Sequence, residues 1–86
     1  MPDQIQTNLT LRVLSQTEEV WQGQVESITA LNAKGTFDVL QDHGNFIALI
    51  SGQITAREPG GNQREFTVTQ GRGVVMVREN KILMFI

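Results

Sequence analysis

Apolar and polar residues alternate along much of this chain, in short segments separated by glycine, asparagine, aspartate and proline. Leu9, Leu11 and Val13 alternate with Thr10 and Arg12. This period of two is typical of a β-strand with one buried face and one solvated face. The spacing of the turn residues predicts a chain built from strands and tight turns.

Alternation predicts strands near residues 9–13, 20–23, 25–31, 36–40, 54–56, 66–68 and 74–77, and the apolar run 82–86 is also expected to be a strand. The apolar run 46–50 is interpreted as a buried strand or as a short apolar turn leading into one. Within 25–31, Ile28 and Ala30 are expected on one face, and Val25 on the other. Ser51-Gly52 is interpreted as a turn. Glu58 to Asn62 contains Pro and two Gly residues and predicts a hairpin loop.

No segment has a convincing helical period, and the count suggests eight to ten short strands in 86 residues. This density predicts an all-β fold: one domain over 1–86, folded as a small two-layer β-sandwich or flattened barrel. Residues 1–8 are expected to be flexible, and Trp21 is expected in the core.

The last segment, Ile82 to Ile86, is apolar on both faces and needs cover on two sides. It is either a central strand of the sandwich or an edge strand whose outer face packs against a partner or a missing segment.

Composition narrows the function classes. The chain has no cysteine, so it has neither disulfides nor a thiolate metal site. Its net charge is −2 and its seven basic residues are scattered, which argues against a nucleic-acid partner. No secretory signal and no run of roughly 20 apolar residues is present, so a cytosolic chain is expected.

Candidate chemistry is sparse. His43, with Asp42 beside it and Asp38 nearby, is the one place where a metal or general-base site could begin. Zinc needs three or four ligands, and a catalytic histidine needs a nucleophile and an orienting partner. A structural role for His43 in a turn is the better interpretation. We therefore expect no enzyme activity, no catalytic residues, no metal and no cofactor.

Three stretches, in order, resemble a known family. They are 21–28 (WQGQVESI), 35–43 (GTFDVLQDH), and the Ser51–Ile54 turn followed by 73–77 (GVVMV) and 80–83 (NKIL). Together the chain, from about Leu9 to Ile86, resembles the N-terminal β-sandwich of the epsilon subunit of F-type ATP synthases. Thr36, Asp38, Gln41 and Asn45 depart from the family pattern. The family continues into a C-terminal helical hairpin, whereas this sequence stops at Ile86, so we expect a divergent member without that hairpin.

The resemblance implies a non-catalytic stalk subunit that docks on the gamma subunit and the c-ring and meets the membrane only through the complex, at its cytoplasmic face. By position, a loop containing Lys34, Gly35, Thr36, Asp38 and His43 would face the c-ring. Met76 and Phe85 would face gamma. The alternative is a free-standing β-barrel module for a small ligand or peptide, which would need a concave apolar pocket.

Overall fold

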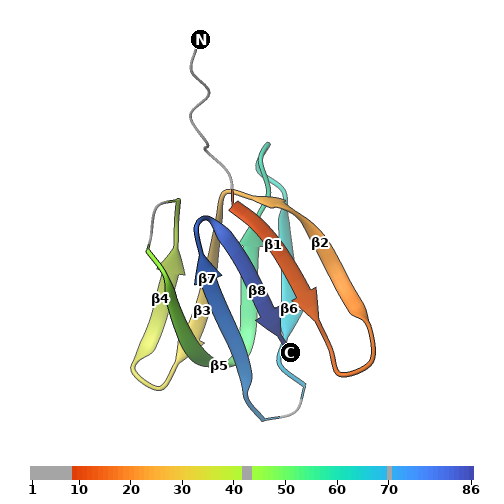
Figure 1. Ribbon diagram of the computed structural model, residues 1–86, viewed down its shortest axis with the longest axis vertical. Helices are drawn as coiled ribbons and strands as arrows, with labels where there is room; N and C mark the ends of the chain where they lie inside the picture. The colour runs from red at the N-terminus through yellow and green to blue at the C-terminus, as the bar shows by residue number, and fades with distance from the viewer. Residues whose placement is uncertain (1–8, 42–43, 70) are drawn as a thin grey trace.

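The computed structural model describes residues 9–41, 44–69 and 71–86. Within these ranges the chain forms eight strands: β1 (Leu9–Leu14), β2 (Glu19–Val25), β3 (Ser27–Asn32), β4 (Gly35–Val39), β5 (Phe46–Arg57), β6 (Gln63–Thr67), β7 (Gly73–Arg78) and β8 (Lys81–Phe85) (Figure 1). The all-β prediction is confirmed. The described residues contain no helix that is long and apolar enough to cross a membrane. The expectations for residues 1–8 and for His43 fall outside the described ranges.

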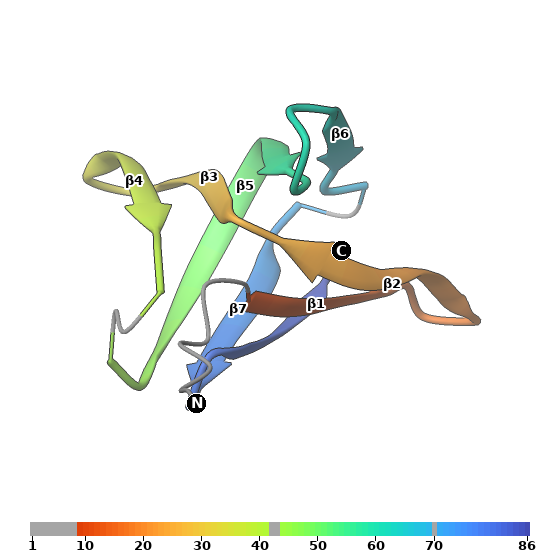
Figure 2. The same cartoon turned by 90° about the horizontal axis from the view of Figure 1, so that it is seen from above.

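The strands form two sheets that share one long strand. Sheet A has the order β2-β1-β8-β7-β5 and uses residues 46–50 of β5. Sheet B consists of β4, β3, β5 and β6 and uses residues 51–57 of β5. Figure 2 shows β5 running from the layer that holds β7 to the layer that holds β3 and β6. The predicted two-layer arrangement is therefore built around a strand that belongs to both layers.

The predicted turn at Ser51-Gly52 is wrong, because β5 continues through it. In β3, one residue, Ala30, separates Thr29 from Leu31. In β5, three residues separate their respective partners, Thr55 and Ser51. Such a bulge bends a strand. Gly52 has a φ of 67°, a conformation that glycine adopts without a steric penalty. The glycine therefore marks a bend within one strand and not the end of a strand.

The single strand predicted over 25–31 is also wrong, because the chain changes sheets at Glu26. Val25 ends β2 and Ser27 begins β3. The N–H of Glu26 donates to the carbonyl of Arg57 at 2.6 Å. The interruption shifts the alternation, so that Val25 and Ile28 are both buried. The prediction that Val25 lies on the opposite face from Ile28 therefore fails.

The core lies between the two sheets and is aliphatic. Its buried side chains are Leu9, Leu11, Val13, Val25, Ile28, Ala30, Val39, Ile50, Ile54, Ala56, Val75, Val77, Ile82 and Met84. Every one is at most 4% exposed. Because this core is closed without help from another chain, the apolar residues left on the outside need a different explanation.

Two aromatic pairs join the sheets at strands that share no backbone ladder. Trp21 of β2 meets Phe66 of β6 with ring centroids 6.1 Å apart. Phe37 of β4 meets Phe46 of β5, also at 6.1 Å, in an edge-to-face arrangement. Trp21 packs against the core as predicted, although it is only half-buried. Its ring lies over Gly23, where an added Cβ would come within 2.6 Å of it.

Strand β8 is central, so the edge-strand alternative is wrong. It pairs in parallel with β1 and antiparallel with β7. Ile82 and Met84 point into the core and are buried. Leu83 and Phe85 point to the other side, where Phe85 is 39% exposed. The segment is therefore apolar on both sides for two different reasons. Its inner side chains fill the core, and its outer side chains belong to the exposed face of sheet A.

The β7–β8 turn has two non-glycine residues in the left-handed region, Glu79 at φ 52° and Asn80 at φ 64°. Asparagine tolerates this region and glutamate does so less readily. We expect Glu79→Asn to raise the free energy of unfolding by about 0.5–1 kcal/mol, measured by urea denaturation. Glu79→Ala is the matched control, since it removes the same charge but lacks the short polar side chain with which asparagine hydrogen-bonds locally in the left-handed region. Equal stabilities of the two variants would contradict the explanation.

Candidate functional site

The outer face of sheet A carries a continuous group of exposed and half-buried apolar side chains. Register between neighbouring strands places them in two adjoining rows, with Leu83, Met76 and Ile47 in one row and Leu14, Phe85, Val74 and Leu49 in the other. We call these seven residues the apolar face. Ile47 is 69% exposed and Leu49 is 53% exposed. A contiguous patch of this kind on a domain with a closed core is typical of a protein interface.

A third row on the same side of sheet A is polar and basic. Lys81 lies opposite Arg78 in the antiparallel pair and opposite Thr10 in the parallel pair. Arg12, at the β1 end of the neighbouring row, bonds Glu19 through its Nε at 2.7 Å. The apolar face is thus bordered by cations on the side of the β7–β8 turn.

The outer face of sheet B has the opposite character. Thr29 donates to Asp38 at 2.6 Å, and Arg57 donates to the hydroxyls of Ser27 and Thr29 at 3.3 and 3.1 Å. On the neighbouring strands, Gln53 donates to Glu65 at 2.6 Å. These polar side chains satisfy one another within the sheet. The two outer faces therefore offer very different surfaces to a partner.

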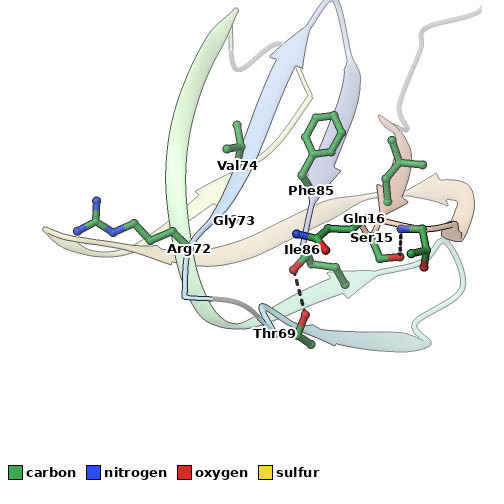
Figure 3. A pocket seen from close by; sticks show the side chains of 10 residues that line it. Ser15, Gln16, Thr69, Arg72, Gly73, Val74, Phe85 and Ile86 are labelled. Atoms are coloured by element: carbon green, nitrogen blue, oxygen red, sulfur yellow. Dashed lines mark hydrogen bonds between the residues drawn. The ribbon is translucent and has the colours of Figure 1, made fainter.

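A hollow adjoins the apolar face beyond the ends of β1 and β8 (Figure 3). Leu14, Val74 and Phe85 line it and also belong to the apolar face, so the hollow is continuous with that face. Opposite them, the hydroxyl of Thr69 donates to the carbonyl of Ile86 at 3.2 Å. Figure 3 shows the Arg72 side chain directed away from this hollow.

The described residues do not gather three histidine, aspartate or glutamate side chains that could hold a metal ion together. The side-chain bonds on both outer faces are surface hydrogen bonds and ion pairs. What this arrangement offers is therefore a shaped contact surface, apolar on one side and polar on the other.

The sequence matches the family described as ATP synthase, Delta/Epsilon chain, beta-sandwich domain over residues 8–85. The chain belongs to this family. Its match covers all eight strands of the delta/epsilon domain described above. A comparison with curated proteins finds no match.

Two solved structures contain chains with the fold of this delta/epsilon domain. One is the Euglena gracilis mitochondrial ATP synthase, OSCP/F1/c-ring in rotational state 1, with 20% identity, a TM-score of 0.85, and coverage of 96% of this chain and 52% of that chain. The other is the central stalk/c-ring of the Tetrahymena thermophila mitochondrial ATP synthase, with 13% identity, a TM-score of 0.68, and coverage of 90% and 61%. The chain thus spans about half to three-fifths of their lengths.

Of the residues expected from the family at the c-ring, the four that the structure describes are divided between a turn and a strand. Lys34 lies in the β3–β4 turn, where its N–H donates to the side chain of Asn32 at 2.8 Å. Gly35, Thr36 and Asp38 belong to strand β4 instead. Thr36 and Asp38 pair with residues of β3 on the polar outer side of sheet B. Most of the expected loop is therefore strand β4. The alternation of apolar and polar side chains that includes Phe37 and Val39 extends back to Gly35, where the strand begins.

The two residues expected at gamma, Met76 and Phe85, do lie together on the apolar face. Sequence reasoning missed five other members: Leu14, Ile47, Leu49, Val74 and Leu83. The signal that could have found Ile47 and Leu49 is the unbroken apolar run 46–50, which is apolar on both faces as 82–86 is.

Two methionines on opposite faces of sheet A provide a direct test of this assignment. Met84 is fully buried, so Met84→Ala should lower the free energy of unfolding by about 2–5 kcal/mol. Met76 is 38% exposed on the apolar face, so Met76→Ala should cost less than about 1 kcal/mol in the isolated chain. Urea denaturation of both variants measures the difference. Equal losses would mean that the apolar face contributes to the core.

Proposed function

We propose that this chain is a non-catalytic subunit of the central stalk of an F-type ATP synthase, bound to the gamma subunit through the apolar face of sheet A. The observation that carries the proposal is a contiguous apolar surface on a domain whose own core is already closed. Membership of the delta/epsilon family supports the assembly. The two structures with a similar fold come from ATP synthases and include a c-ring.

The apolar face is suited to gamma because it extends over four strands of one sheet. Its side chains come from β1, β5, β7 and β8, which are held by continuous ladders. A rigid surface loses little conformational freedom on binding, and removal of the exposed apolar area from water favours association. Such a contact can transmit a mechanical load without any chemistry in this subunit.

The c-ring contact is proposed for the other sheet. Lys34, Gly35, Thr36 and Asp38 lie at the β3–β4 hairpin, on the side of the molecule where polar residues predominate. His43, expected at the same contact, completes the residues assigned by family resemblance. A polar surface suits the polar loops of a membrane ring. We propose that the subunit meets the membrane only through the complex, at its cytoplasmic face.

In this role the subunit couples ion flow through the membrane to ATP synthesis by shape and packing alone. The hydroxyl, carboxylate and guanidinium groups of sheet B are engaged with one another, as in the bonds of Thr29 with Asp38 and Arg57. These interactions hold the surface in one form, which a part that turns with the rotor requires.

The variant Ile47→Asp tests the gamma contact. Ile47 is 69% exposed, so the substitution should leave folding intact while placing a charge in the apolar face. We expect its affinity for the purified gamma subunit, measured by isothermal titration calorimetry, to fall at least about tenfold.

The matched control is Thr67→Asp, which adds the same charge to an exposed position of sheet B. It should bind gamma as the wild type does. A folded Ile47→Asp chain with wild-type affinity would rule out the apolar face as the gamma contact.

A further inference from the structure

We propose that Arg78 and Lys81 form a receptor for a carboxylate side chain of the polypeptide that covers the apolar face. This inference rests on the proposed function, since it takes gamma as that polypeptide. It adds the chemistry of the contact: an aspartate or glutamate of the partner, seated at the β7–β8 end of the apolar face.

The first observation is a pair of like charges held directly opposite one another. Arg78 and Lys81 are register partners in the antiparallel β7–β8 ladder. Both are exposed on the outer face of sheet A. Like charges directly opposite each other in a ladder destabilise it. The chain thus carries an electrostatic cost at this position.

The second observation is that no carboxylate of this chain relieves that cost among the described residues. Their two ion pairs are Arg12 with Glu19 and Arg64 with Glu58, each at 2.7 Å. Arg12 stands on the same outer face and already has its carboxylate. Arg78 and Lys81 form neither an ion pair nor a side-chain hydrogen bond with the described part of the chain.

The third observation is that the turn holds the two cations in place. The side-chain oxygen of Asn45 accepts the N–H of Glu79 at 3.0 Å. The carbonyl of Asn80 accepts the N–H of Thr10 at 3.0 Å. Both turn residues have positive φ. Positive φ at both central residues is the geometry of a two-residue hairpin turn that matches the twist of its strands, so this turn fixes the spacing between Arg78 and Lys81.

The fourth observation is the position of the pair next to apolar side chains. Arg78 is two residues from Met76 in β7, and Lys81 is two residues from Leu83 in β8, on the same face. A shallow hollow is lined by these four residues and Arg12. Once a partner covers Met76 and Leu83, water is excluded, and a hydrogen bond from Arg78 to a carboxylate becomes stronger.

A polypeptide carboxylate fits this hollow better than a nucleic acid does. Phosphate backbones are bound by runs of cations, whereas this chain has a net charge of −2 and presents an isolated pair. The methylene groups of a glutamate or aspartate can pack against Met76 and Leu83, and its carboxylate can reach Arg78 and Lys81.

The test is the double variant Arg78→Gln, Lys81→Gln in the 86-residue chain. We expect its affinity for gamma to fall about tenfold or more, and its binding to depend less on salt than that of the wild type. We also expect a higher midpoint of thermal unfolding for the variant alone, because the like-charge pair is gone. A lower midpoint would overturn the first step of the inference.

The matched control is Asn62→Glu, Gln63→Glu, which makes the net charge more negative by the same amount at the exposed β5–β6 hairpin. It should leave the affinity for gamma unchanged. An equal loss of affinity in the control would mean that net charge alone explains the effect. That result would overturn the inference.

The inference and the proposed function can fail separately. If Ile47→Asp abolishes gamma binding but the double glutamine variant binds normally, the apolar face is the contact and the carboxylate receptor is wrong. If neither variant changes the affinity for gamma, both are wrong. If the double glutamine variant binds gamma normally but binds RNA or anionic vesicles more weakly than the wild type does, the cations serve a phosphate ligand. The inference then fails.

Discussion

The architecture depends on one constraint: β5 must supply hydrogen bonds to two different sheets. Residues 46–50 bond to β7, and residues 51–57 bond to β3 and β6. The strand can do this because the bulge at Gly52 turns it from one layer to the other. Ile50 and Ile54, on either side of the bend, are both buried. The space between the layers, and therefore the core, exists because this strand bends without breaking.

Because the strands are divided between two layers, the two outer faces differ in chemical character. Sheet B covers itself with mutually bonded polar groups such as Thr29, Asp38 and Arg57. Sheet A leaves Ile47, Leu49 and their neighbours exposed. Because the core is closed by the inner faces alone, the outer face of sheet A can be shaped by recognition with little effect on folding. Stability and binding are thus carried by opposite sides of the same strands.

Much of the fold could be predicted from turn residues and period-two alternation. Pro and Gly placed the Glu58–Asn62 hairpin loop correctly, and alternation found a strand on each side of it, although β5 begins well before the predicted 54–56 and β6 begins before the predicted 66–68. It failed at Glu26 and Gly52, where a change of sheet and a bulge alter the alternation through tertiary pairing that the local sequence does not encode. Only part of the candidate site could be predicted from the sequence. Met76 and Phe85 follow from family resemblance, but a position such as Ile47 joins them only through the register of β5 with β7. Register between distant strands is settled by packing of the whole chain.

The parallel pairing of β1 with β8 ties the timing of folding to the whole length of the chain. Leu11 lies beside Ile82 at the centre of sheet A, and Ile86 donates to the carbonyl of Leu14 at 2.9 Å. The ribosome therefore releases β1 and β2 long before the strand that must lie between β1 and β7 has been made. Until then the hairpin of β1 and β2 has an open inner edge, which favours slow, late completion of the sheet.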